Sequence, residues 1–400
     1  MTETAQRPTV DDRPARRPEL DAIRTLVVVG LVFFHAALVF DASDDFYVKN
    51  AQTTSVTTVL AGFGVLWAMP ALFLIAGSGS WHSMARRGAG GFVRERLQRL
   101  GVPLLFAILT FLPVPVWLRL KAADPGYQES YLSFLPKFYE VHLDLSDFPF
   151  VLRGDYFETG HLWFVVLLLT FSLLLALLVR WLPGKLARDA LARAVAHRGV
   201  VLLPAFATSA ICAWIGMEEA FAGWSRWAYL LFFLCGFLLA ADERFRLAMR
   251  RDAALAGIVG VVVFAVCGPV LLTAGDEPFT AMTAHAISAR ALFGFAGWCA
   301  VVAILGLLDR RNVNRQASAG STEPSRAARA YRYLAVAALP LYVLHQPIVV
   351  AVAYGVVRWD APILVKYLAI VVASLALTLA AYDVLVRRTR VTRYLFGMRD

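Results

Sequence analysis

Long uninterrupted apolar segments constrain this 400-residue chain more than any other feature. They run for about 17 to 25 residues, and a helix needs about 20 residues to cross roughly 30 Å of hydrocarbon. A backbone in lipid must satisfy its own hydrogen bonds, which helices achieve and an open sheet cannot. The sequence therefore predicts an all-α polytopic membrane helical bundle of about ten transmembrane helices. The predicted spans are 22–41, 58–77, 101–119, 161–181, 199–217, 225–241, 255–274, 284–308, 333–356 and 362–385.

The charged residues between these spans alternate in sign from one loop to the next. The net charge is +10, and the loops of one side hold 30 of the 39 Lys and Arg residues. The other loops are acidic, with Asp41, Glu218 and Asp276 among their residues. This asymmetry is typical of membrane proteins whose basic loops face the cytoplasm. It predicts cytoplasmic amino and carboxyl termini, and it explains the basic composition without a nucleic-acid partner. The basic segments are 1–24, 86–99, 180–198, 244–251, 310–332 and 387–399.

Little sequence lies outside the spans. Residues 1–18 are predicted to be a disordered cytoplasmic tail, 19–386 one transmembrane domain, and 387–400 a basic cytoplasmic tail. Within the domain, 309–330 has the composition of a flexible cytoplasmic linker. The first apolar run is longer than the core of a signal peptide, so we expect it to remain as a span. The four cysteines lie in predicted spans without metal-ligand spacing and imply no disulfide framework.

Two ionisable residues, Arg24 and His35, bracket the apolar run of the first span. A step of eleven residues along a helix separates them by about 16 Å along the axis. Arg24 is therefore expected at one membrane face and His35 near the middle of the bilayer. An ionisable side chain at that depth is costly unless it is paired or hydrated, which makes His35 a candidate functional residue. The simpler alternative is an imidazole that only hydrogen-bonds a neighbouring helix.

A second basic cluster precedes the third span and contains Arg96 and Arg99. Residues three apart share one face of a helix. Two guanidinium groups on one face at the cytoplasmic boundary suit a phosphorylated ligand. Ordinary positive-inside anchoring explains such arginines as well, so the spacing leaves both interpretations open.

The ninth span contains His345 and Gln346 between Pro340 and Pro347. Each proline removes one helical hydrogen bond and leaves a carbonyl without its usual partner. Freed carbonyls beside a polar His-Gln pair indicate a hydrated cavity inside the bundle.

Two other intramembrane residues are candidates because of their position. His161 opens the fourth span near the outer face, and Arg290 lies a short way into the eighth. A metal site built from His35, His161 and His345 lacks support from a close ligand pair such as His-x3-His, so no metal is expected.

The long outer segment 121–160 is acidic and rich in aromatic residues. Aromatic residues at a membrane face are usually interface anchors. Loops of this length are uncommon without a function, and aromatic faces beside carboxylates also suit a sugar or polyol acceptor. Both interpretations remain open at this stage.

Five motifs follow one another along the chain: Arg24-x10-His35, the segment Met69-Pro70-Ala-Leu-Phe-Leu-Ile-Ala-Gly77, Arg96-x-x-Arg99 with Pro103, His161-Leu-Trp-Phe, and Leu341-Tyr-Val-Leu-His345-Gln-Pro347. In this order they resemble the acyltransferase-3 family of integral-membrane acyltransferases, over roughly residues 18–385. One departure is Ala76-Gly77-Ser78, where the family more often has Ser-Gly followed by an aromatic or apolar residue.

The resemblance implies a function in which an acyl group moves from cytoplasmic acyl-coenzyme A to a hydroxyl of an extracytoplasmic glycan or lipid. It implies that His35 is the catalytic histidine and that Arg24, Arg96 and Arg99 bind the coenzyme. His345, with Gln346, is expected to orient the acyl group or polarise its carbonyl. Acetyl-coenzyme A and succinyl-coenzyme A both fit as co-substrates. The expected location is the bacterial inner membrane, with the co-substrate, the acceptor and membrane lipids as partners.

The chemistry agrees with this resemblance, because a neutral imidazole can take a proton from a hydroxyl that attacks a thioester. No nucleophile stands beside His35 in the sequence, which favours direct transfer over an acyl-enzyme. The main alternative is a transporter or flippase that uses the intramembrane His and Arg residues as a relay. No internal repeat supports an inverted-repeat transporter. Nothing in the sequence favours a non-catalytic receptor or scaffold.

Overall fold

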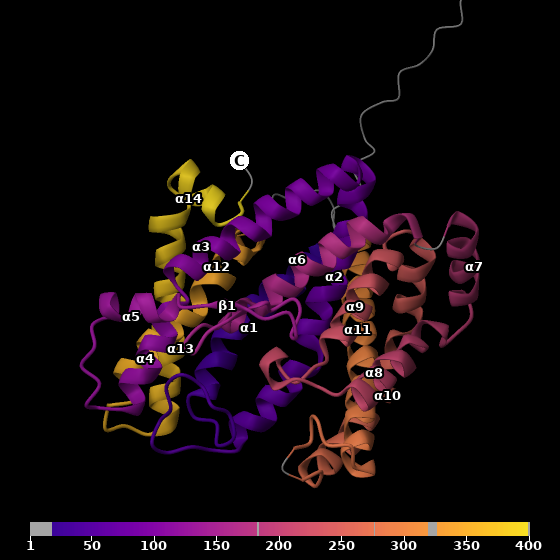
Figure 1. Cartoon of the computed structure of the whole chain (residues 1–400). Helices are drawn as coiled ribbons and strands as arrows, with labels where there is room; N and C mark the ends of the chain where they lie inside the picture. Colours follow the sequence, from indigo (N-terminus) through magenta and orange to yellow (C-terminus); the bar gives the residue numbers. More distant parts are fainter. Residues whose placement is uncertain (1–17, 182–183, 276, 319–325, 399–400) are drawn as a thin grey trace, which may run out of the picture.

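The computed structural model describes residues 18–181, 184–275, 277–318 and 326–398, and these form an all-α helical bundle with one two-stranded hairpin (Figure 1). The predicted fold class is confirmed. The α-helices are α1 (Pro18–Leu38), α2 (Val56–Arg96), α3 (Val102–Thr110), α4 (Pro113–Ala123), α5 (Tyr131–Phe138), α6 (Trp163–Leu178), α7 (Lys185–Val195), α8 (Pro204–Ile215), α9 (Arg226–Leu239), α10 (Glu243–Leu272), α11 (Ala284–Ser318), α12 (Arg326–Val356), α13 (Ile363–Ala381) and α14 (Arg390–Leu395). The strands are β1 (His142–Leu143) and β2 (Leu152–Arg153), and the short turns are η1 (Leu97–Gly101), η2 (Gly160–Leu162), η3 (Val179–Trp181), η4 (Val200–Leu202), η5 (Glu219–Phe221) and η6 (Tyr382–Val386).

All ten predicted spans are helical, but they differ in length. Within the described residues, seven helical stretches are long and apolar enough to cross a membrane, and an eighth is a pair of helices bent by 113°. One of the seven, Ala61–Ala123, covers two predicted spans, and α9 has only 14 residues. The chain is a multi-pass membrane protein with fewer full-length spans than predicted.

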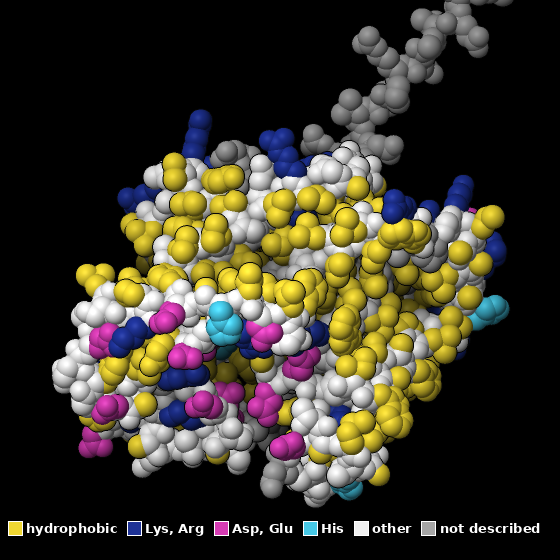
Figure 2. Space-filling view, viewed as in Figure 1, with side chains coloured by type: hydrophobic (Ala, Val, Ile, Leu, Met, Phe, Trp, Pro, Cys, Tyr) yellow, Lys and Arg dark blue, Asp and Glu magenta, His cyan; other side chains and the backbone are white. Residues whose placement is uncertain are grey.

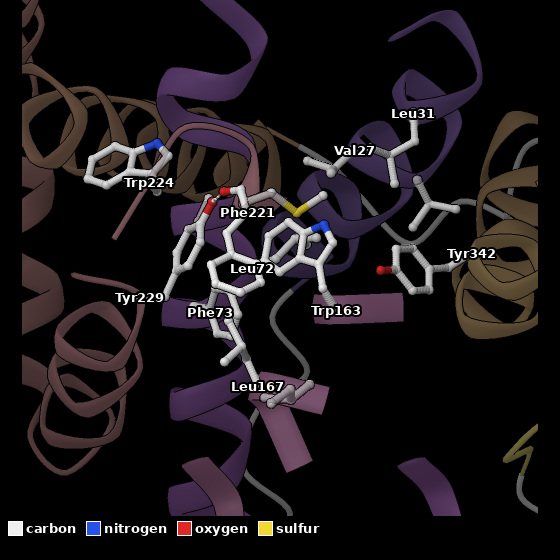
Figure 3. Packing of buried hydrophobic residues seen from close by; sticks show 14 of the residues in the cluster. Val27, Leu31, Leu72, Phe73, Trp163, Leu167, Phe221, Trp224, Tyr229 and Tyr342 are labelled. Atoms are coloured by element: carbon white, nitrogen blue, oxygen red, sulfur yellow. Dashed lines mark hydrogen bonds between the residues drawn. The ribbon is translucent and has the colours of Figure 1, made fainter. Parts of the chain in front are cut away.

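α1 lies in the interior of the bundle and contacts α2, α11, α12 and α13. Its buried side chains include Ile23, Val27 and Leu31, which belong to the main hydrophobic core. Aromatic rings fill the space beside them, where Phe73 and Trp163 both pack on Tyr229 (Figure 3). A second group of helices, α8, α10 and α11, packs together on the other side of α2 and α9. The central position of α1 places His35 where several helices meet.

Two glycines allow α2 and α9 to approach closely. A Cβ atom on Gly77 would lie 1.9 Å from the carbonyl oxygen of Phe233, and a Cβ atom on Gly236 would lie 1.9 Å from that of Leu74. Small residues of this kind permit backbone contact between membrane helices. The Ala-Gly-Ser segment that departs from the family pattern is therefore part of this helix contact.

The basic segments meet at one end of the bundle, which we call the basic end. Asn312 of α11 donates a hydrogen bond to Glu19 of α1, and the Arg99 side chain contacts the Gly397 carbonyl. In Figure 2, Lys and Arg side chains lie along the upper edge, above a band of hydrophobic side chains. Acidic and basic side chains surround a hollow lower on this face.

Several predicted loops contain more helix than the sequence suggested. α11 continues to Ser318 and α12 begins at Arg326, so the connection inside the predicted linker is shorter; residues 319–325 lie outside the described part, as do 1–17 of the predicted tail. The 121–160 segment contains α5 and the β1–β2 hairpin, and the predicted tail 387–400 contains α14.

Candidate functional site

Three histidines from three different helical segments meet inside the bundle. His35 comes from α1, His161 from the turn η2 and His345 from α12. The His345 ring centroid lies 5.0 Å from that of His35 and 5.0 Å from that of His161. All three side chains are buried. The structure therefore brings the two predicted catalytic histidines into direct contact.

Hydrogen bonds fix the proton positions of His35 and His345. The Nδ1 atom of His345 lies 2.6 Å from the Tyr342 carbonyl oxygen, so Nδ1 must donate and Nε2 carries the lone pair. The Nδ1 atom of His35 lies 3.2 Å from that Nε2 and 2.9 Å from the Leu31 carbonyl oxygen. Both neighbours are acceptors, so the hydrogen of His35 is on Nδ1. In the neutral imidazole, Nε2 of His35 is left as a base.

His161 is held by the helix that contains the two prolines. Pro347 has no N–H, so the Val343 carbonyl lacks its helical partner. The Nε2 atom of His161 lies 3.2 Å from this carbonyl oxygen and can only donate to it. The Tyr342 hydroxyl donates to the His161 carbonyl. The predicted freed carbonyl is thus present, and a histidine from another segment donates a hydrogen bond to it.

A cavity of about 980 Å³ opens toward the end of the bundle opposite the basic end, and we call it the histidine cavity. His35 and His161 line its inner part, and Glu158 lies nearer its mouth, in the loop before His161. Figure 2 shows a hollow on the face with acidic and basic side chains. The lining includes Tyr47, Asp147, Phe150, Arg153, Phe157, Trp163, Phe221 and Gln346.

Tyr47 and Glu158 form a hydrogen-bonded pair in this cavity, and neither residue is predicted from the sequence to have a role. The Tyr47 hydroxyl donates to Glu158. Arg119 lies 4.5 Å from the centre of the Tyr47 ring and 3.8 Å from a Glu158 oxygen. Burial raises the pKa of Glu158, opposed by the Tyr47 hydrogen bond and by Arg119. Burial also raises the pKa of Tyr47, so this hydroxyl keeps its proton and remains a donor.

The hairpin loop between β1 and β2 closes one side of the histidine cavity. Asp147 of this loop lies 2.6 Å from Arg226, which also binds Glu218. Phe150 stacks on Phe221 with their ring centroids 4.9 Å apart. The predicted long aromatic segment therefore forms part of a cavity wall.

A second cavity, of about 1300 Å³, opens at the basic end and is called the basic cavity. Arg24, Arg86 and Arg246 line it together with His82 and Ser78. Acidic residues line it too, and Arg24 lies 3.5 Å from one of them, Asp21. A narrower extension of about 440 Å³ runs inward between α2, α9 and α11. Of the three predicted coenzyme-binding arginines, Arg24 lines this cavity.

Arg96 and Arg99 do not line the basic cavity. Arg96 donates to Ser80 at 3.0 Å, and Arg99 lies 3.7 Å from Glu95 and 3.4 Å from the Gly397 carbonyl. The two arginines thus contact different partners; Arg96 ends α2, and Arg99 lies in η1, which is a π-helical turn.

Buried apolar side chains lie between the levels of Arg24 and His35 along α1. Figure 3 shows Val27 and Leu31 of α1 beside Leu72 of α2 and Trp163 of α6. All four are buried. Arg24 and His35 belong to one continuous helix, so about 16 Å separates the level of the basic cavity from that of the histidine base.

Arg290 is fully buried and serves the fold. Its guanidinium group donates to the carbonyl oxygens of Cys212 and Ala213, in the last turn of α8, and to those of Pro278 and Ala281. A cation at a helix carboxyl terminus is stabilising. Among the described residues, no group of three or more His, Cys, Asp or Glu side chains is arranged to hold a metal ion.

Comparison with known families gives the chain an assignment. The acyltransferase-3 family model, an acyltransferase domain, matches residues 17–383. No curated protein and no solved structure matches the chain. The family model covers the three histidines and both cavities. The protein is an acyltransferase and a member of the acyltransferase-3 family.

Proposed function

We propose that this enzyme moves an acyl group from acyl-coenzyme A on the cytoplasmic side to a hydroxyl of a glycan or lipid on the other side, with His35 as general base. The observation that carries the proposal is the state of His35. Its Nδ1–H is held by Leu31 and His345, and its Nε2 is a base in a side chain that lines an open cavity. A positioned histidine base accelerates proton transfer from an attacking hydroxyl.

The basic cavity supports a coenzyme site at the cytoplasmic end. The phosphates of acyl-coenzyme A need cations, and Arg24, Arg86 and Arg246 supply them at the cavity wall. Leu20, Ile75 and Leu239 supply an apolar wall for the extended arm. Arg96, in this proposal, supports the site through Ser80, which follows the cavity residue Gly79 directly. Coenzyme binding by Arg99 also stays a proposal. The contact of its side chain with the Gly397 carbonyl ties η1 to the carboxyl-terminal segment.

Transfer requires the thioester to reach His35 from the basic cavity. Val27 and Leu31 lie between Arg24 and His35 along α1 and belong to the same packed core as Leu72, so in this proposal these side chains move aside for the acyl arm. The acceptor enters through the histidine cavity. Direct transfer remains the favoured route, and His345 holds the Nδ1–H of His35 while the base acts.

The acyl group and the acceptor are the finer parts of this proposal. The sequence motifs also resemble those of glucan biosynthesis protein C, which succinylates periplasmic glucans. Succinyl-coenzyme A with a glucan is therefore the first pair to test, followed by acetyl-coenzyme A and by envelope lipids. The positive-inside pattern supports insertion in the bacterial inner membrane with both termini in the cytoplasm.

The test uses inside-out membrane vesicles that contain the full chain. Radiolabelled succinyl- or acetyl-coenzyme A is added outside, and label in vesicle-retained glycans and lipids is identified by mass spectrometry. We expect transfer with the wild type and with His197→Ala, an exposed control. His35→Ala should insert normally and abolish transfer. Full transfer by His35→Ala would overturn the proposal.

The transporter or flippase alternative is not favoured, because the chain belongs to an acyltransferase family. It would move a solute across the vesicle membrane without acyl-coenzyme A, and its flux would not depend on the basic cavity. Wild-type vesicles that show solute flux but no acyl transfer with either donor would favour it.

A further inference from the structure

Gln346 is a polar side chain of the histidine cavity, and the sequence predicts only that it orients the acyl group or polarises its carbonyl together with His345. It belongs to α12, directly after His345, and its side chain is buried. It lines the cavity together with His35 and His161. A buried amide offers two donors and one acceptor, so the orientation of its two ends decides what it can do.

The orientation of the Gln346 amide follows from one hydrogen bond. The backbone N–H of His161 donates to the side-chain oxygen of Gln346 at 2.9 Å. A backbone N–H needs an acceptor, so the oxygen end must face His161 and the NH2 end must point elsewhere. Gly160 leaves room beside this pair, since a Cβ atom there would lie in tight contact with the Tyr47 hydroxyl at 3.1 Å and in ordinary contact with the Gln346 oxygen at 3.6 Å. Gly160 also has φ +47°, in the region that favours glycine.

The NH2 end of Gln346 is left as a donor for the cavity. The side-chain nitrogen of Gln346 makes no hydrogen bond to another described residue. It is also not one of the fully enclosed polar atoms that lack a partner, so it is at least partly accessible. It therefore reaches the cavity that the histidine base also lines. A fixed donor beside a base is the arrangement that stabilises negative charge on a carbonyl oxygen under attack.

We infer that the side-chain NH2 of Gln346 donates a hydrogen bond to the thioester carbonyl oxygen as it becomes an oxyanion. The inference rests on the proposed function. The hydroxyl oxygen of the acceptor forms a bond to the carbonyl carbon while Nε2 of His35 takes the hydroxyl proton. Gln346 stabilises the resulting oxyanion. The carbonyl then re-forms, the carbon–sulfur bond breaks, and the thiolate leaves with the proton from His35, giving an ester and free coenzyme A.

Two variants separate this role from a purely structural one. Gln346→Glu keeps a side-chain oxygen for the His161 N–H but replaces the NH2 donor, and it is assayed at a pH where a carboxyl group is ionised. Gln346→Met loses both ends. Loss of one oxyanion donor typically lowers kcat by about 10²- to 10³-fold. We expect losses of this size in both variants, with little change in the KM of succinyl- or acetyl-coenzyme A.

The structural alternative makes a different prediction for the same pair. If Gln346 only holds His161, Gln346→Glu keeps its kcat and Gln346→Met loses it. That result, or a normal kcat in both variants, would overturn the inference. If the Glu variant does not insert, a normal kcat in the Met variant still refutes it. Gln52→Glu, an exposed substitution of the same chemistry, is the matched control and should change nothing.

The assay also separates this inference from the proposed function. Wild-type vesicles without acyl transfer, or His35→Ala with full transfer, would contradict the proposed function itself. Wild-type transfer that depends on His35 but not on the Gln346 donor would contradict the oxyanion role alone. Thermal unfolding of each purified variant shows whether a change in kcat comes from lost stability.

Discussion

Replacing His345 by Met tests how the histidine pair works. In the resting enzyme, His345 accepts a hydrogen bond from the neutral Nδ1–H of His35. When His35 takes the acceptor's proton, the same bond becomes charge-assisted. A neutral hydrogen bond contributes about 0.5–1.5 kcal/mol and one to a charged group about 1.5–3 kcal/mol. The part gained only in the transition state is thus about 0.5–2 kcal/mol, equivalent to roughly 2- to 30-fold in kcat.

His345→Met should therefore lower kcat by roughly 2- to 30-fold without abolishing it. The Leu31 carbonyl still accepts from Nδ1 of His35, so the correct tautomer persists in the variant. His345→Gln is the matched control, because its amide oxygen can replace the lost acceptor at Nε2. We expect its kcat to lie between those of the Met variant and the wild type. Initial rates of labelled acyl transfer in vesicles measure all three proteins.

Two results would refute this reasoning. If His345→Met is as inactive as His35→Ala, then His345 takes part in the chemistry itself. If the Met variant has wild-type kcat, the bond between the two rings does not stabilise the transition state. Thermal unfolding is measured alongside, because the Met variant also loses the bond from His345 to the Tyr342 carbonyl.

Four further substitutions test other parts of the structure. Arg24→Gln should raise the apparent KM for acyl-coenzyme A by about 10- to 100-fold, the value of a charge-assisted hydrogen bond, whereas an unchanged donor dependence would reduce Arg24 to a topology anchor. Arg290→Met should destabilise the protein by at least about 3 kcal/mol in thermal unfolding, because four backbone carbonyls lose a charged donor, and wild-type stability would contradict the structural role. Gly236→Ala should cost about 1–3 kcal/mol or more through its clash with a carbonyl of α2, whereas Gly268→Ala, with open space around it, should cost nothing. The pKa of Glu158 is raised in the folded protein, so its contribution to stability is largest at acidic pH and is lost as the pH rises through that pKa. The melting temperature of Glu158→Gln should therefore rise relative to that of the wild type between mildly acidic and neutral pH. A difference in melting temperature that stays constant with pH would contradict the burial effect.

The helices could be predicted from the sequence because lipid imposes one solution on long apolar segments. Their ends could not. α11 runs to Ser318, well past the predicted boundary at 308, since charged residues leave the membrane without ending a helix. α9 is shorter than a span, and its apolar composition matched that of the longer helices. Apolar length locates spans, while the contacts at each end decide where the helix stops.

The histidine pair shows the same division between local and distant information. Arg24 and His35 could be related from sequence because one helix carries both. The contact between His35 and His345 joins residues 310 positions apart, and no spacing rule predicts such a contact. Tyr47 and Glu158 carried no motif of their own, although Glu158 lies three residues before His161. The sequence offered one signal for Glu158, which is a carboxylate placed just before a span that begins with a histidine.

The Pro347 residue explains why part of the site was predictable and part was not. Local chemistry requires that proline frees the Val343 carbonyl, so a polar group had to be found there. Only the fold identifies that group as His161, which enters from a segment 182 positions away. Its backbone N–H then fixes the Gln346 amide one residue before the proline. The proline thus determines which backbone carbonyl of the ninth span lacks a helical hydrogen bond. The packing of η2 against α12 determines which atom of the Gln346 amide is left to bind the substrate.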